Sequence, residues 1–213
     1  NRYMSACTTL ATADMVVESD SKELRALQRA TTELLFVDGN HHCPGCERSG
    51  NCQLQAVGYA LGMQDRHFAH LFPTHRLDAS HPDIVLDRDR CILCGLCVRA
   101  SEKDGKNIFT ISGRGDLSRL DVCTESGLLG DSSLETSDLA AQICPVGALL
   151  VRGEGFRIPI GKRIYDQHDI ITAGNIRPEY EASEHKGPNY QSKGHNMRCD
   201  LGVGDSDKGS GDE

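Results

Sequence analysis

The sequence lacks several features that mark other classes of protein. It has no tryptophan, and aromatic residues make up only 5% of its 213 residues. The formal net charge of −8 disfavours nucleic acid or an anionic membrane as a partner. No run approaches the roughly 18 apolar residues of a membrane span, and no secretory signal segment is visible. These absences predict a cytoplasmic protein.

Motifs for independent catalysis are also missing. The chain shows no Ser–His–Asp, P-loop or H-E-x-x-H pattern, and the glycines of "SGRGDLSR" (112–119) do not form a nucleotide-binding loop. No nicotinamide, flavin or nickel motif is present. We therefore expect no catalytic residue in this chain and assign its chemistry to bound cofactors.

Cysteine, by contrast, is abundant, with ten residues in the chain. Such a number indicates disulfides, zinc sites or iron–sulfur clusters. Disulfides persist in oxidising compartments, and nothing in the sequence signals export. Zinc and iron–sulfur clusters remain.

The second group of cysteines indicates an iron–sulfur cluster. Cys91, Cys94 and Cys97 match the first three ligands of the bacterial ferredoxin pattern C-x2-C-x2-C-x3-C-P, but its fourth position holds Ser101. Cys144, followed by Pro145, is the remaining ligand of a degenerate second copy. Structural zinc prefers two well-separated C-x2–4-C pairs. The spacing thus predicts one [4Fe–4S] cluster held by Cys91, Cys94, Cys97 and Cys144.

The first group supplies three thiols and needs a fourth ligand. Cys43, Cys46 and Cys52 stand close together in the chain, directly after His41 and His42. A nearby histidine costs less loop-closure entropy than a distant cysteine. Because alternate side chains of an extended segment face the same way, we favour His41 over His42. The alternative is that both histidines are solvated loop residues and the fourth ligand is Cys123.

The expected fold is α+β. We predict helices over 21–36, with Asp20 and Glu23 forming a capping box and Gly39 ending the helix, over 52–63 and over 133–143. Strands are expected at 84–88, 106–112 and the end of 144–151. A small His/Cys [4Fe–4S] domain is thus followed by a degenerate ferredoxin-like βαβ domain. The polar composition from Lys186 onward predicts a mobile tail.

The motifs resemble a segment shared by several electron-transfer proteins. "ELLFVDGNHHCPGCERSGNCQLQAVGY", "DRDRCILCGLCVR", "AAQICPVGALL" and "PIGKRIYD" are similar to complex I large iron–sulfur subunits, [FeFe]-hydrogenase amino-terminal regions, NAD-dependent formate dehydrogenases and the small diaphorase subunits of NAD-reducing [NiFe]-hydrogenases. The last family, HoxU, is favoured because the histidine stands two residues before the first cysteine. Most of the wider family has it four before, where this chain has Gly39.

The resemblance implies further cofactors and partners. Cys7, in an "ACTT" sequence, would be the fourth ligand of a plant-type [2Fe–2S] cluster whose other ligands lie upstream, so we expect the sequence to be a fragment. The implied partners are a HoxF-like flavin/NAD-binding diaphorase subunit and HoxY-like and HoxH-like hydrogenase small and large subunits. Electrons would pass from a [NiFe] module through the clusters to the flavin module. A histidine ligand would raise one cluster's potential.

These observations divide the chain into four predicted parts. Residues 1–20 end a mostly missing [2Fe–2S] domain, 21–80 form the His/Cys-ligated [4Fe–4S] domain, 81–155 form the ferredoxin-like domain, and 156–213 form an extended tail. Cys123 and Cys199 are expected to be bystanders. We assign the histidines of residues 67–81 to loops and a subunit-contact surface; they are His67, His70, His75 and His81. A fragment of complex I or of formate dehydrogenase and a zinc-stapled interaction module remain alternatives.

Overall fold

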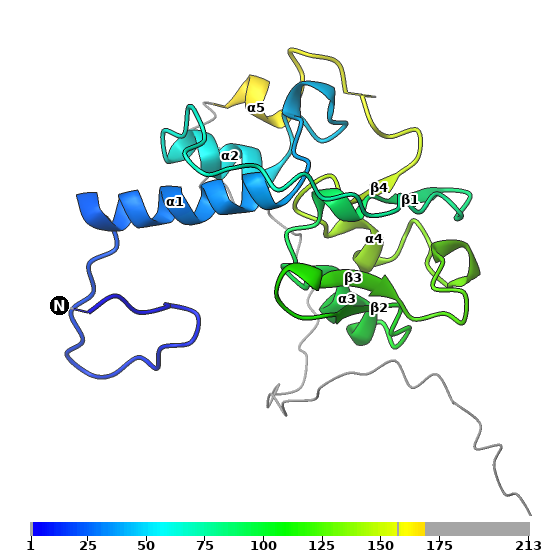
Figure 1. The fold of residues 1–213 in the computed structure, drawn as a ribbon, viewed down its shortest axis with the longest axis horizontal. Coiled ribbons are helices and arrows are strands. Elements are labelled where there is room, and N and C mark those ends of the chain that lie inside the picture. The colour runs from blue at the N-terminus through cyan, green and yellow to red at the C-terminus, as the bar shows by residue number, and fades with distance from the viewer. Residues whose placement is uncertain (1, 157, 169–213) are drawn as a thin grey trace, which may run out of the picture.

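The computed structural model describes residues 2–156 and 158–168 (Figure 1). Its helices are α1 (Lys22–Asp38), α2 (Gln53–Ala60), α3 (Leu96–Lys103), α4 (Leu139–Gln142) and α5 (Ile164–Gln167). Its strands are β1 (Ile84–Leu86), β2 (Phe109–Ser112), β3 (Arg119–Val122) and β4 (Leu149–Val151). Helices α1 and α2 pack together on one side, and the strands lie with α3 and α4 on the other. The fold is therefore mixed α/β, with short elements joined by long loops.

Helix α1 begins at a different cap from the one predicted. The Ser21 side chain accepts a hydrogen bond from the backbone N–H of Leu24 at 3.2 Å, and this satisfies one of the free amides of the first turn. The Asp20 carboxylate instead pairs with Arg25 at 3.4 Å. The predicted Asp20–Glu23 capping box is therefore wrong, although the helix is present.

The strands form two separate antiparallel pairs. Strand β1 pairs with β4, with Ile84 opposite Val151, and β2 pairs with β3, with Phe109 opposite Val122. The expected ferredoxin-like βαβ arrangement is not confirmed, because a βαβ unit joins parallel strands. The predicted strands at 84–88, 106–112 and the end of 144–151 correspond to shorter ones, whereas β3 and α3 were not anticipated.

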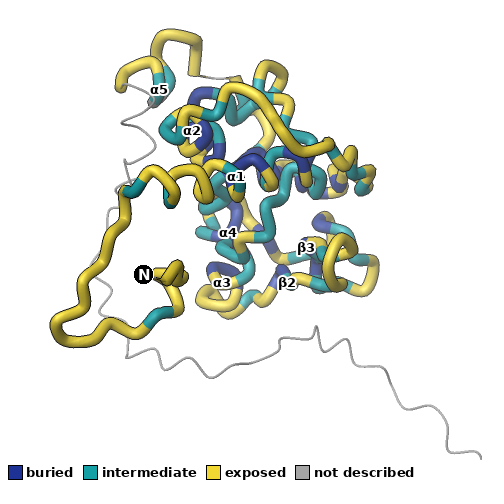
Figure 2. Tube along the Cα trace, turned by 60° about the vertical axis from the view of Figure 1, so that its left-hand side comes forward, coloured by how far each residue is buried: buried dark blue, intermediate teal, exposed yellow. Residues whose placement is uncertain are grey.

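The main apolar core lies between these two strand pairs and α3 and α4. Ile84, Leu86, Phe109, Leu120 and Leu129 are at most 2% exposed. A second, smaller cluster contains Cys52, Leu54, Val146 and Ala148, with Cys91 and Cys144 packed against it. Figure 2 shows that residues 2–20 are almost entirely exposed, and these residues belong to neither core. Cysteines of both groups therefore meet at this second cluster.

Helix α4 is much shorter than the predicted helix 133–143. Residues 133–138 form a loop because their polar groups are bound elsewhere: Lys106 Nζ donates to the Ser133 carbonyl at 2.9 Å and to Asp138 Oδ2 at 2.7 Å. Asp138 also accepts from the Glu135 amide at 2.8 Å. The helix therefore starts only after Asp138, and it ends at Gln142, shortly before Cys144.

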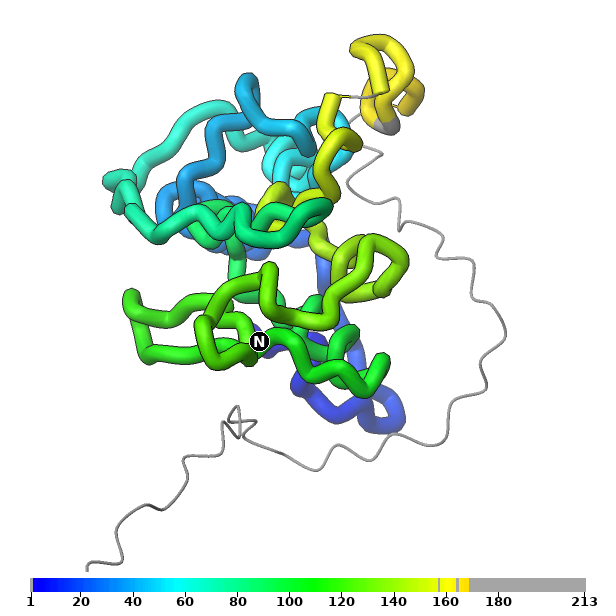
Figure 3. The backbone as a smooth tube through the Cα atoms, turned by 90° about the vertical axis from the view of Figure 1, so that its right-hand side faces the viewer, coloured from blue at the N-terminus to red at the C-terminus, as the bar shows by residue number. Residues whose placement is uncertain are grey.

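Part of the predicted extended tail is folded. Beyond β4 the chain passes the loop Cys43–Cys52 and forms α5 (Figure 3). The Tyr165 amide donates to the Gly50 carbonyl at 3.2 Å, so α5 lies against that loop. The remaining predicted tail, including the mobile part from Lys186, falls outside the described residues. In the described part of the chain, no helix is long and apolar enough to cross a membrane.

Candidate metal centre

The first cysteine group sits on a tight loop between α1 and α2. Cys43 opens a short 3₁₀ turn with Pro44, and successive turn bonds carry the chain to Cys46 and on to Ser49. Cys52 then precedes the first residue of α2. The backbone N–H groups of Leu54 and Gln55, at the start of that helix, act to lower the pKa of the Cys52 thiol, which favours a thiolate. The local sequence therefore brings all three thiols to one end of α2.

These thiols act on one another electrostatically. Burial raises the pKa of Cys43, and the charge of Cys46 raises it further. Burial likewise raises the pKa of Cys52, against the opposing effect of the α2 amides. A bound metal centre would offset both costs, because thiolates are its ligands. All three cysteines are free.

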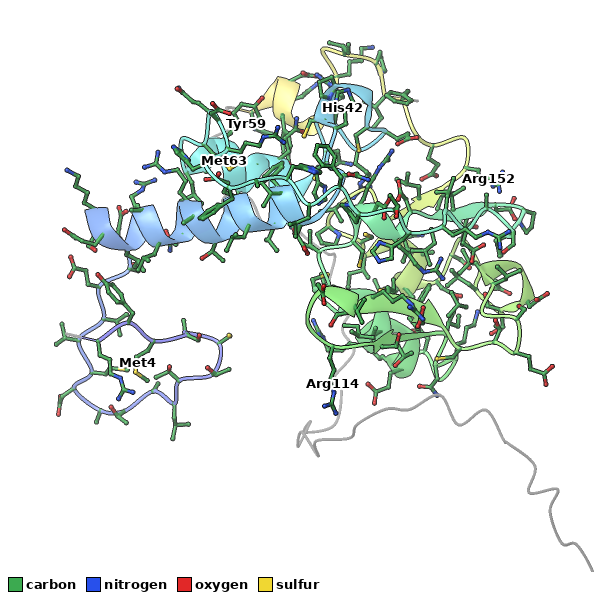
Figure 4. All side chains as sticks on the ribbon, viewed as in Figure 1. Met4, His42, Tyr59, Met63, Arg114 and Arg152 are labelled. Carbon is green, nitrogen blue, oxygen red and sulfur yellow. The ribbon has the colours of Figure 1, made fainter. Side chains whose placement is uncertain are left out.

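His41 and His42 differ in their surroundings. The His41 ring packs edge-on against Phe36 with 5.6 Å between ring centres, and its Nε2 is buried without a hydrogen-bond partner in the described residues. His42 is exposed (labelled in Figure 4). Burial and the charge of Arg90 lower the pKa of His41 to about 4. A neutral ring with an unpartnered nitrogen is what a metal ligand requires.

Gly39 makes room for the His41 ring. A Cβ at position 39 would lie 2.6 Å from His41 Nε2 and 2.8 Å from the Asp89 carbonyl oxygen, closer than side chains pack. The chain is further fixed here by the Asn40 amide, which donates to that same carbonyl at 2.7 Å. The ring of residue 41 thus occupies the space into which a side chain at position 39 would extend.

The second cysteine group surrounds one apolar cavity. Its wall contains all four predicted thiols, which come from the loop before α3, from α3 itself and from the segment after α4. The other wall residues are Ile92, Leu93, Gly95, Leu96, Ile111, Leu120, Pro145, Val146, Ala148 and Leu149. Among the described residues, no other polar side chain lines this cavity, so the four thiols are the side-chain ligands that this wall offers.

Local backbone geometry turns these thiols inward. Leu93 and Gly95 have positive φ angles of 52° and 67°, so the chain folds tightly between Cys91 and Cys97. Burial and the neighbouring thiols raise the pKa of Cys91 to about 11 and that of Cys97 to about 12. Backbone N–H groups of residues 146, 148 and 149 act on the Cys144 thiol, the kind of contact that stabilises cluster sulfurs.

The spacing of these potential ligands suits an iron–sulfur cluster better than a single metal ion. Among the described residues, no three His, Cys, Asp or Glu side chains are close enough to hold one metal ion. Ligands of a cubane stand farther apart than those of one tetrahedral ion, because each thiolate binds a different iron atom. Four thiols around one apolar cavity can serve such a cluster.

Three further cysteines and one histidine were also singled out in the sequence. Cys7 is a free, exposed thiol in the segment before α1. Cys123 directly follows β3, and Cys199 falls outside the described residues. His81 was assigned to a contact surface, but it is only 8% exposed: its Nδ1 accepts from the Ile84 amide at 3.1 Å and its Nε2 donates to the Leu134 carbonyl. That assignment is wrong for His81.

Sequence reasoning missed the polar residues that join the two sites. Arg48 Nη2 donates to the Cys144 carbonyl at 3.1 Å, and Arg90 Nη1 lies 3.7 Å from Cys46 Sγ. The Gln53 amide donates to the Pro145 carbonyl at 3.0 Å. The available signal was an arginine, Arg90, directly before Cys91, but the sequence does not show which residue this arginine contacts.

Two families of iron–sulfur proteins match the two cysteine groups. Residues 28–67 match the NADH-ubiquinone oxidoreductase-G iron-sulfur binding region, and residues 84–151 match the 4Fe-4S single cluster domain. The first region contains the three cysteines of the first group, and the second region contains the four of the second group, Cys144 included. The chain therefore contains 4Fe–4S binding regions.

The chain is also similar over most of its length to hydrogenase subunits. It is 42% identical over 168 residues to the gamma subunit of the NAD-reducing hydrogenase HoxS of Cupriavidus necator, covering 78% of this chain and 71% of that protein. A chain in the crystal structure of an NAD+-reducing [NiFe]-hydrogenase in the H2-reduced state shares 52% identity with a TM-score of 0.75, covering 77% of this chain and 70% of that one.

Subunits of NADH-quinone oxidoreductases are more distant relatives. One such subunit, from Mycobacterium bovis, is 34% identical over 159 residues, which cover 72% of this chain but only 19% of that protein. This chain thus spans about a fifth of the length of that relative, against most of the length of the hydrogenase subunit.

Proposed function

We propose, from the premise that the chain belongs to the family of the gamma subunit of the NAD-reducing hydrogenase HoxS, that it relays electrons from a hydrogenase module to an NAD-reducing module. It is an iron–sulfur electron-transfer subunit of an oxidoreductase complex. The observation that supports the proposal best is the apolar cavity whose wall brings Cys91, Cys94 and Cys97 together with the remote Cys144.

Two ligand sets are proposed. His41, Cys43, Cys46 and Cys52 would hold one [4Fe–4S] cluster, and Cys91, Cys94, Cys97 and Cys144 a second. Bound clusters of this type supply one-electron transfer. The chain's own residues fix the position of each group, exclude water from the second site through its apolar wall, and donate backbone N–H groups to the Cys144 thiol. Cys7 is proposed as one ligand of a [2Fe–2S] cluster.

The overall reaction sets what must pass through the chain. Oxidation of H2 to two protons releases two electrons, and reduction of NAD+ to NADH consumes two electrons and one proton. Neither reaction takes place on this chain. We propose that hydrogenase small and large subunits of the HoxY and HoxH type deliver the electrons and that a flavin-containing HoxF-type subunit receives them, one at a time.

Cluster content tests the ligand sets. The assembled complex would be purified anaerobically, and its iron, zinc and reducible EPR signals measured. Two [4Fe–4S] clusters contribute about eight iron atoms. The Cys144→Ser variant should lose about four of these iron atoms together with one EPR signal. The Cys46→Ser variant should lose the other four and the other signal, whereas Cys123→Ser should lose no iron. Stoichiometric zinc without a reducible signal would refute the relay, and loss of the first signal in Cys123→Ser would refute His41 as ligand.

A further inference from the structure

Arg90 reaches from one cysteine group to the other. It stands directly before Cys91 of the second group, at the end of the 3₁₀ turn Arg88–Arg90. Its guanidinium extends to the first group, where Nη1 donates to Cys46 Sγ at 3.7 Å and to Glu47 Oε2 at 2.7 Å. One side chain therefore joins the backbone of one proposed ligand to the sulfur of another.

The guanidinium is held in place by its surroundings. Its Nε pairs with Asp87 Oδ2 at 2.9 Å. The carboxylates of Glu47 and Asp87, which come from different segments, therefore both bind this side chain, which is only 22% exposed. Gly147 completes the contact: a Cβ there would lie 3.0 Å from Cys46 Sγ and 3.4 Å from Arg90 Nη1. The segments around residues 46, 90 and 147 thus meet at the Cys46 sulfur.

We infer that Arg90 raises the reduction potential of the first cluster and so sets how electrons divide between the two clusters. The inference rests on the proposed function. Reduction adds a negative charge to a cluster, and a nearby positive charge with an N–H···S hydrogen bond stabilises that charge. Arg90 stands within hydrogen-bond reach of the first group's sulfur, whereas it meets the second group only through the backbone. Its effect therefore falls mainly on the first cluster.

The geometry also makes Arg90 a short connection between the two sites. From Cys46 Sγ the path crosses one hydrogen bond to the guanidinium, follows the Arg90 side chain and enters Cys91 through a peptide bond. Arg48 makes a second connection in the opposite direction, from the first loop to the Cys144 carbonyl. Arg48 meets a carbonyl oxygen, whereas Arg90 donates a hydrogen bond to a cysteine sulfur.

The test is a redox titration of the assembled complex, followed by EPR. In Arg90→Gln, the first cluster should become harder to reduce by about tenfold in its equilibrium constant, which equals about 59 mV for one electron. The second cluster should keep its potential. Arg90→Lys preserves the positive charge with fewer hydrogen-bond donors. It should therefore recover most of the potential that is lost in Arg90→Gln. The double variant Arg90→Gln with Glu47→Gln returns the local charge to its original value. The potential of its first cluster should lie between those of the unchanged chain and Arg90→Gln.

Arg152→Gln is the matched control. It removes the same charge, but its side chain is bound to the Ala79 carbonyl and lies far from the His42 loop in Figure 4. It should leave both potentials unchanged. The inference is overturned if the first cluster of Arg90→Gln titrates like the unchanged chain, or if Arg90→Lys behaves like Arg90→Gln. Absence of clusters from the unchanged chain would instead refute the proposed function.

Discussion

His41 and His42 are adjacent in the chain, yet they meet different surroundings. Only His41 has a buried ring nitrogen without a partner among the described residues. We therefore predict that His41→Ala removes the first cluster, about four iron atoms per chain, while His42→Ala retains it. Iron analysis and EPR of both variants check this expectation. Equal loss in the two variants, or retention in both, would contradict the assignment of His41.

Gly39 offers a second prediction at the scale of single residues. Its added methyl group in Gly39→Ala would collide with the His41 ring and the Asp89 carbonyl. We expect a loss of about 1–3 kcal/mol in the free energy of unfolding, as for other overpacked sites. Urea denaturation measures this loss. Truncating the ring in Gly39→Ala with His41→Ala should recover part of it, and equal stability of all three chains would show that position 39 tolerates a side chain.

At the scale of elements, α5 stabilises the loop that carries Cys52. The Tyr165 hydroxyl donates to the Cys52 carbonyl at 2.6 Å, and Arg163 Nη1 donates to the Ser49 carbonyl at 3.5 Å. Burial raises the pKa of Tyr165 to about 12, so the hydroxyl remains a donor at neutral pH. These contacts give the folded part of the predicted tail a structural role.

Removing that hydroxyl should weaken the element without changing its shape. We predict that Tyr165→Phe lowers the free energy of unfolding by about 1 kcal/mol, the usual worth of one buried hydrogen bond. Hydrogen exchange of the Ser49–Cys52 segment should quicken. The exposed Tyr59 (Figure 4) provides the control, because Tyr59→Phe removes a hydroxyl that faces solvent. Equal exchange in both variants would remove the proposed role of α5.

Helices were easier to predict than the pairing of strands. The helical spacing of apolar residues over 21–36 predicted α1, and the helix expected over 52–63 is present as the shorter α2. The helix at 133–143 failed because Lys106, far away in the chain, binds the Ser133 carbonyl and Asp138. Local periodicity carries no information about such a distant partner. Strand β3, which pairs with β2, was not predicted either.

At the scale of the whole molecule, Asp78 joins two distant segments. Its Oδ2 accepts from the Leu129 amide at 2.8 Å, and its Oδ1 accepts from the Ser80 hydroxyl at 2.6 Å. Burial raises the pKa of Asp78, but these hydrogen bonds lower it more, so the folded value lies below the ordinary one. The carboxylate therefore stabilises the fold only while it is ionised.

The sign of the pH dependence follows from that lowered pKa. The contribution of Asp78 is complete above its unfolded pKa of about 3.9 and disappears as the pH falls through the lower folded value. We predict that Asp78→Asn costs about 1–3 kcal/mol at pH 7, where an acceptor is lost, and progressively less below pH about 4. Urea denaturation across this range measures the difference. The exposed Asp83→Asn serves as control, and a constant difference at all pH values would contradict the prediction.

The sequence by itself determined the family and the candidate ligands, because cysteine spacing within a short segment decides which thiols can reach one cluster. It could link Cys144 to the second group only through the ferredoxin pattern, and assignment of all eight ligands stays a prediction. Only the tertiary structure decided that the two groups lie together, that Arg90 meets Cys46, and that the strands pair antiparallel. These contacts join residues far apart in the chain, and packing of the whole molecule rather than local spacing brings such residues together.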